Sequence, residues 1–95
     1  VYKRQIKTQL MVLIEQGKKC KETDYHKSNR SVPYFDGENL MLWKENCCRF
    51  LSENFPDEQV TKVILPWRGA KSIYESTYNQ VVDGLQKLFE RFNNE

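Results

Sequence analysis

This 95-residue chain lacks long hydrophobic runs, a disulfide-type cysteine pattern and an initiating methionine. It contains no stretch of about eighteen apolar residues, the length that crosses a bilayer, and no signal-like apolar segment lies near its start. Its three cysteines are Cys20, Cys47 and Cys48, an odd number without the spacing of a disulfide framework. We therefore expect no membrane span, reduced thiols and a cytoplasmic location. Because the chain begins at Val1, we also expect it to be a piece of a longer polypeptide.

The residues that common catalytic and metal sites require are equally scarce. The chain has one histidine, His26, and neither C-x-x-C nor H-x-x-x-H spacing for zinc. Cys47 and Cys48 point about 100° apart on a helix, so they do not readily share one metal ion. The glycines are isolated and form no phosphate-binding loop. We therefore expect no enzyme activity, no metal and no cofactor.

Charge is distributed unevenly, although the net charge is only +2. Residues 1–32 hold eight Lys or Arg against three Asp or Glu, whereas the remainder holds seven against ten. A basic leading segment of this kind is either an electrostatic contact for RNA or an anionic membrane, or simply a solvated face. The residues that would contact RNA phosphates are Lys3, Arg4, Lys7, Lys18, Lys19 and Lys21.

Hydrophobic periodicity predicts an amphipathic helix at the start of the chain. The predicted segments are an N-terminal helix at residues 1–17, a polar basic linker at 18–31 and a helical body at 32–95. Gly17 is a natural C-terminal stop for the helix. Its apolar stripe, which includes Ile6, Leu10 and Leu13, must be covered by the body or by another copy of the chain. A dimer built through this helix is one expectation.

The body is predicted to be all-α, a bundle of about four to five short helices. Pro33 favours a short extended arm over Val32–Phe35, and Asp36 stands where it can cap the helix that follows. The apolar pattern indicates helices that end near Asn54, begin at Pro56, span Trp67 to Glu75 and open at Thr77. No long alternating strand pattern appears. Gly84, inside the last helix, indicates a close contact between helices.

A series of short motifs runs in order through residues 32–95. The matching residues are Phe35 and Gly37, then Trp43, then Trp67, Gly69 and Tyr74, then Leu85, Leu88, Phe89 and Phe92. This order resembles the capsid region of Gag polyproteins from LTR retrotransposons, especially the gypsy class, and of domesticated Gag proteins such as Arc. Trp67 stands where leucine is usual in that family, and Tyr74 where a second tryptophan is usual. The zinc knuckle that usually binds RNA in these proteins is absent from the sequence.

The resemblance implies the N-terminal lobe of a capsid, which self-assembles into a homo-oligomeric shell around RNA, in the cytoplasm or in virus-like particles. The implied partners are other copies of the chain, RNA through the wider protein, and an extended peptide held in an apolar groove. Two alternatives stay open, a basic nucleic-acid-binding helical domain and a peptide-binding adaptor lobe. The residues expected to serve self-association or a groove are Ile6, Leu10, Leu13, Tyr34, Phe35, Trp67 and Tyr74.

The purely structural interpretation of the aromatic residues is that they form the core, since so small a domain needs its large side chains for stability. We expect this of Trp43, Phe50 and Phe89. Trp67 stands at a helix start broken by Pro66, where a fully buried indole is harder to arrange. We therefore expect Trp67 to be partly exposed and to contact a partner.

Overall fold

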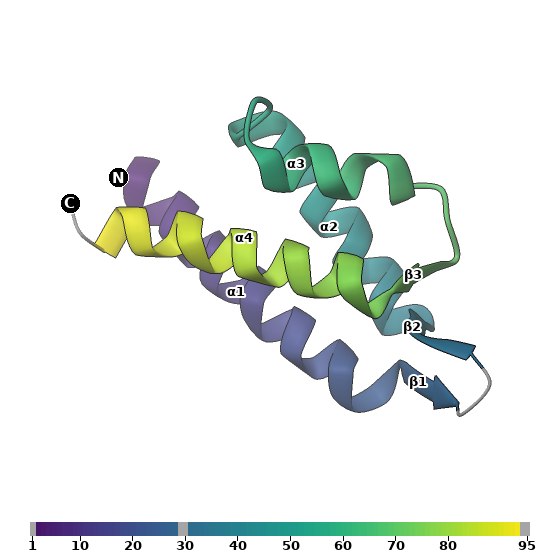
Figure 1. Ribbon diagram of the computed structural model, residues 1–95. Coiled ribbons are helices and arrows are strands. Elements are labelled where there is room, and N and C mark those ends of the chain that lie inside the picture. Colours follow the sequence, from purple (N-terminus) through teal and green to yellow (C-terminus); the bar gives the residue numbers. More distant parts are fainter. Residues whose placement is uncertain (1, 29–30, 94–95) are drawn as a thin grey trace.

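The computed structural model describes residues 2–28 and 31–93; the side chains of residues 2, 3, 28, 31 and 93 are not among those described. The described chain forms four α-helices, a short 3-10 helix and a three-stranded sheet: α1 (Tyr2–Thr23), β1 (Tyr25–Ser28), β2 (Ser31–Asp36), α2 (Glu38–Asn54), α3 (Gln59–Ile64), η1 (Leu65–Trp67), β3 (Ser72–Tyr74) and α4 (Glu75–Asn93). The sheet lies where α1 ends and α4 begins, and both chain ends lie at the opposite end of the molecule (Figure 1).

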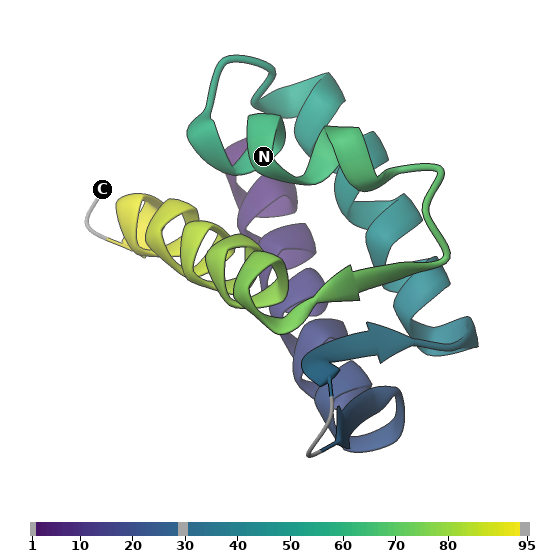
Figure 2. The same ribbon diagram turned by 45° about the vertical axis from the view of Figure 1, so that its right-hand side comes forward.

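The prediction of an all-α bundle is wrong, because the fold is mixed and contains an antiparallel sheet of order β1-β2-β3. The segment Val32–Phe35 is extended, as Pro33 indicates, but it belongs to the central strand and is not a separate arm. The helix predicted from Trp67 to Glu75 is absent: after the end of η1, a turn leads into β3, which runs directly into α4 (Figure 2). In β3, Ile73 pairs with Phe35 and is buried, so tertiary packing selects a strand there.

The prediction that Gly17 ends the first helix is also wrong. α1 runs through Gly17 to Thr23, and most of the predicted linker is therefore the end of α1 followed by β1. A Cβ atom at position 17 would lie 3.1 Å from the indole of Trp43. Glycine thus lets the large ring approach the helix backbone, and the residue marks a packing contact in place of a helix end.

Two buried aromatic residues hold α1 against the rest of the chain. The indole N–H of Trp43 donates to the carbonyl of Leu13 at 2.8 Å, and the hydroxyl of Tyr78 donates to the carbonyl of Gly17. A carbonyl has two lone pairs, so each can accept this bond beside its helical one. The ring of Phe35 stacks on Tyr78 with centroids 4.1 Å apart. The inner face of the sheet and the apolar stripe of α1 therefore share one core.

The start of α2 is capped by a side chain that is distant in the sequence. Asp36 does not cap it, contrary to the prediction; the carboxylate of Asp24 accepts the N–H of Leu40 at 2.6 Å. Gly37 has a φ of 150°, and a Cβ atom there would lie 2.5 Å from the Asp24 carboxyl carbon. Only glycine tolerates both this backbone and this approach. The buried Asp24 side chain thus joins the end of α1 to the start of α2.

The close helix contact expected at Gly84 is confirmed, and it yields a stability prediction. A Cβ atom at position 84 would lie 2.5 Å from Cβ of Val60 on α3, whereas one at Gly69 would meet nothing within 4 Å. Alanine would gain about 1 kcal/mol of helix propensity, but overpacking of this kind typically costs about 1–3 kcal/mol. We expect Gly84→Ala to lower the free energy of unfolding and Gly69→Ala to leave it nearly unchanged. Urea denaturation measures both, and equal stability of the two variants would contradict the packing argument.

A second prediction concerns alkaline pH. Burial raises the pKa of Cys20 from 9.0 to about 11 and that of Tyr78 from 10.0 to about 12. A raised folded pKa contributes stability that is present below the unfolded pKa and lost as pH rises through the folded one. Burial also raises the pKa values of Cys47 and Cys48, while it lowers that of Lys44, which acts in the opposite sense.

The hydrogen bond to Glu75 also raises the pKa of Tyr25, so five groups oppose one and the free energy of unfolding should fall as pH rises from about 9 to 12. Guanidinium denaturation at a series of pH values measures this. Tyr78→Phe, which loses a buried hydrogen bond at a cost of about 1 kcal/mol, should start lower but fall less steeply above pH 10. A free energy of unfolding that stays constant from pH 8 to above the raised pKa values of Cys20 and Tyr78 would show that these groups are not desolvated.

Candidate functional site

A row of aromatic side chains crosses the outer face of the sheet. The strand register places His26 of β1 opposite Tyr34 of β2, and Tyr34 opposite Tyr74 of β3. Because successive side chains of a strand point to opposite faces, these three lie on the face away from Phe35, which is buried in the core. Trp67 of η1 continues the row beyond Tyr74. We call these four residues, His26, Tyr34, Tyr74 and Trp67, the aromatic strip.

The rings of the aromatic strip are in contact in pairs. His26 stacks on Tyr34 with centroids 5.1 Å apart and an interplanar angle of 20°. Its Nε2 also lies 3.2 Å from the backbone carbonyl of Asp36, which fixes the imidazole. At the other end, Trp67 and Tyr74 meet at 81° with centroids 5.7 Å apart, which forms a corner. Tyr74 is 50% exposed and His26 is also exposed, so the strip presents ring surface to solvent.

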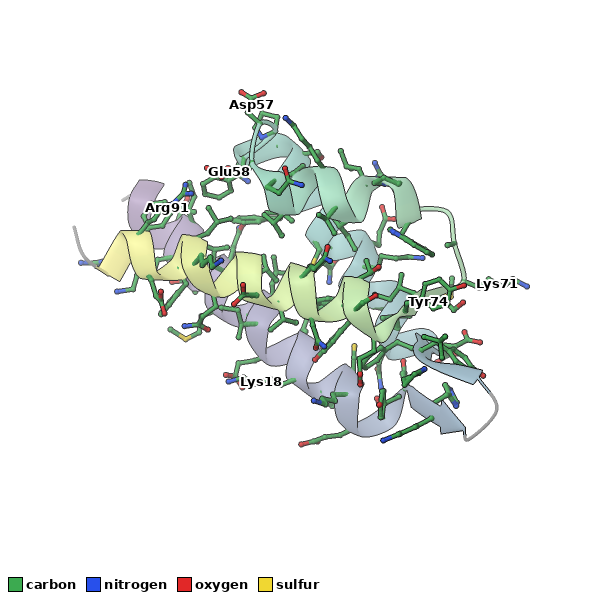
Figure 3. All side chains as sticks on the ribbon, in the orientation of Figure 1. Lys18, Asp57, Glu58, Lys71, Tyr74 and Arg91 are labelled. Carbon is green, nitrogen blue, oxygen red and sulfur yellow. The ribbon has the colours of Figure 1, made fainter. Side chains whose placement is uncertain are left out.

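Cationic side chains stand at both ends of the strip. Lys27 follows His26 on the edge strand β1 and is exposed; its side chain leaves the face opposite to His26 and reaches the strip only around the edge of the sheet. Lys71 precedes β3 and extends away from the molecule beside Tyr74 (Figure 3). Neither lysine forms an ion pair with the residues that the structure describes. Arg68, next to Trp67, is paired with Glu45 at 3.0 Å. The outer face of β2 also carries one exposed carboxylate, Asp36, two residues beyond Tyr34.

The structure brings together three of the residues predicted for self-association or a groove: Tyr34, Trp67 and Tyr74. Trp67 is half-buried, as expected, while Phe35 is fully buried and contributes to the core. Sequence reasoning missed His26, which it assigned to a polar linker. The available signal was the hairpin itself: once β1 and β2 are paired, the period of two places His26 beside Tyr34.

The other predicted association residues, Ile6, Leu10 and Leu13, are buried within this chain. Their stripe is covered by the body, which was one of the two alternatives. α1 nevertheless leaves apolar surface open, since Met11 is 48% exposed and Val12 is 50% exposed. Val12 borders a groove of about 330 Å³ between α1 and α2, whose lining residues are Gln9, Val12, Leu13, Gln16, Asn46, Arg49, Phe50 and Glu53.

The basic residues proposed for RNA contact are spread along α1. The side chain of Lys3 lies outside the described residues, and Arg4, Lys18, Lys19 and Lys21 are exposed. The ammonium of Lys7 lies 5.6 Å from the ring centroid of Phe89, a cation–π contact, and Lys18 lies 3.8 Å from Glu15. Lys18, Lys19 and Lys21 lie within about one turn near the end of α1, whereas Arg4 and Lys7 lie near its start, and no open aromatic ring accompanies them in the described contacts.

The buried thiols differ from activated nucleophiles. Burial raises the pKa of Cys47 and of Cys48, and burial together with the charge of Asp24 raises that of Cys20, so all three stay protonated at neutral pH. Lys44 of α2 is only 3% exposed, and burial lowers the pKa of its ammonium. These groups belong to the packing of α2 against its neighbours.

Within residues 2–28 and 31–93, no cluster of three or more His, Cys, Asp or Glu is arranged to hold a metal ion. The helices of this part of the chain include none that is long and apolar enough to cross a membrane. The aromatic strip and the open face of α1 are two surfaces open to a partner; α2 also leaves an adjacent apolar pair open, with Met41 51% and Leu42 62% exposed. In comparisons with protein-family models, curated proteins and solved structures, no match to this chain was found.

Proposed function

We propose that this chain is a self-assembly module of the kind found in Gag capsids, in which copies of one rigid lobe associate through weak, repeated contacts. The observation that carries the proposal is the pair Met11 and Val12, two apolar side chains left about half exposed on a helix whose main stripe is already buried. The order of motifs from Phe35 to Phe92, which resembles the capsid region, supports it. The occupant that we propose for this surface is a second copy of the chain.

The outer stripe of α1 is complementary to itself in an antiparallel arrangement. It is formed by residues at alternating steps of three and four, namely Arg4, Thr8, Met11, Glu15, Lys18 and Glu22. A two-fold axis near residue 13 would bring Arg4 of one copy to Glu22 of the other and would place Met11 beside Glu15. Such an isologous contact uses the same patch on both copies. Opposite charges, Arg4 and Glu22, then stand at the two ends of the contact.

The contact is small, which suits an assembly module. The open apolar surface of each copy is about half of two side chains, so a single pair of copies should associate only weakly. Weak contacts become effective when many of them act together in one particle. A rigid core with both Trp43 and Tyr78 anchored to α1 keeps the angle between contacts fixed.

We expect the chain to dimerise reversibly at high concentration and to keep doing so in high salt, because apolar association does not weaken with ionic strength. The double substitution Met11→Gln and Val12→Gln should weaken association about tenfold or more without unfolding the protein. Size exclusion with light scattering over a concentration series measures the effect. Val32→Gln, an equally exposed apolar site on β2, is the matched control and should leave association unchanged. A strict monomer at every concentration and salt would defeat the proposal for this chain.

A further inference from the structure

We propose that the aromatic strip binds single-stranded nucleic acid, with bases stacked on the exposed rings and phosphates held by Lys27 and Lys71. This goes beyond self-assembly and uses a different surface, at the sheet end of the molecule and not along the middle of α1. The inference rests on the row of rings, on their exposure and on the unpaired cations at both ends.

The size and shape of the strip suit a few nucleotides. Neighbouring strands lie about 4.8 Å apart, so three strand positions and Trp67 together span about 15 Å, the length of two or three extended nucleotides. His26 and Tyr34 are nearly parallel and stack on each other, so a base would extend this stack at its end. Trp67 and Tyr74 form a corner at the other end, where a flat base can contact the face of one ring and the edge of the next. Stacking of this kind accepts any base.

The charges around the strip favour a polyanion. Lys27 at the β1 end and Lys71 at the β3 end have no ion pair in the described chain, so each is available to a phosphate. Arg68 adds a further cation beside Trp67, although Glu45 neutralises it. The one exposed carboxylate on the outer face of β2 is Asp36, which stands beside the row and not within it. Lys71 lies on the Asp36 side of the row and Lys27 on the other side, so a strand that contacts both lysines would cross the row obliquely.

The competing basic surface, the outer face of α1, lacks these features. Lys18 and Lys19 are exposed there, but the aromatic ring nearest to the cations of α1, Phe89, is only partly open and already contacts Lys7. Phosphate contacts alone would favour any polyanion, including duplex DNA. Unpaired bases are needed to use a row of rings. The strip therefore predicts a preference for single strands over duplexes.

Binding can be measured with a fluorescently labelled six-nucleotide oligouridine and its deoxythymidine equivalent, which form little structure of their own. Anisotropy gives the affinity of the 95-residue chain, and tryptophan fluorescence gives the location. Of the two tryptophans, Trp43 is 1% exposed and Trp67 is partly open, so quenching by the unlabelled oligonucleotide reports on Trp67. We expect saturable quenching that is lost in Trp67→Phe, and weaker binding of the matching duplex.

The variants separate stacking from charge. Tyr74→Ser should weaken binding about tenfold through the loss of one stacked base. The double variant Lys27→Ala and Lys71→Ala should reduce the slope of log affinity against log salt, expected near −1.4 for two phosphate contacts, toward zero. Asp36→Asn should strengthen binding about twofold by removing the repelling charge. Lys18→Ala with Lys19→Ala, on the outer face of α1, is the matched control and should leave affinity nearly unchanged.

Three results would overturn the proposal. The first is the absence of oligonucleotide binding at low salt when circular dichroism shows the chain to be folded. The second is binding that survives Tyr74→Ser but disappears with the Lys18 and Lys19 substitutions, which would place the nucleic acid on α1. The third is a change in Trp67 emission with protein concentration alone, which would mean that a second copy covers the strip. Equal affinity for the ribose and deoxyribose oligonucleotides would support the proposal, since stacking does not read the sugar.

Discussion

The carboxylate of Asp24 is the point on which the arrangement of the chain depends. Asp24 follows the last residue of α1 and is buried, and its carboxylate accepts the N–H of Leu40 at the start of α2. Its own carbonyl accepts the N–H of Asp36 at 3.0 Å, which closes the hairpin between the two helices. A helix start needs such an acceptor because its first N–H groups have no partner within the helix. One side chain therefore sets the end of α1, the return of β2 and the direction of α2.

This closure explains why aromatic residues appear on the outside. Once Asp24 and Asp36 are held together, β1 and β2 must pair in one register, with Tyr25 opposite Phe35 and His26 opposite Tyr34. A shift by one residue would exchange the buried row for the exposed one. The burial of Phe35 against Tyr78 thus determines the exposure of Tyr34. The outer row of rings follows from the inner row, so the surface proposed to bind nucleic acid arises from a packing requirement.

The sequence allowed the long helices to be predicted but not the sheet. Apolar residues at steps of three and four marked α1, α2 and α4, and the core positions of Trp43 and Phe50 are confirmed. The strands were not predicted because β1 and β3 have only four and three residues, too few to show the alternation of apolar and polar side chains that marks a strand. Gly17 was misread since a helix stop and a ring contact call for the same residue. At the candidate site, Trp67, Tyr34 and Tyr74 were recognised as unusual, whereas His26 required knowledge of a pairing that no local signal announces.

Both ends of the described chain lie at the end of the molecule away from the sheet (Figure 1). A bead, a dye, a fusion partner or a neighbouring domain joined at either end would therefore stand clear of the aromatic strip. Copies tethered to a common surface by their ends would all be oriented with their sheets pointing away from that surface. In that orientation the density of strips is set by the spacing of the tethers, so a layer of this small protein could be made multivalent by attachment alone.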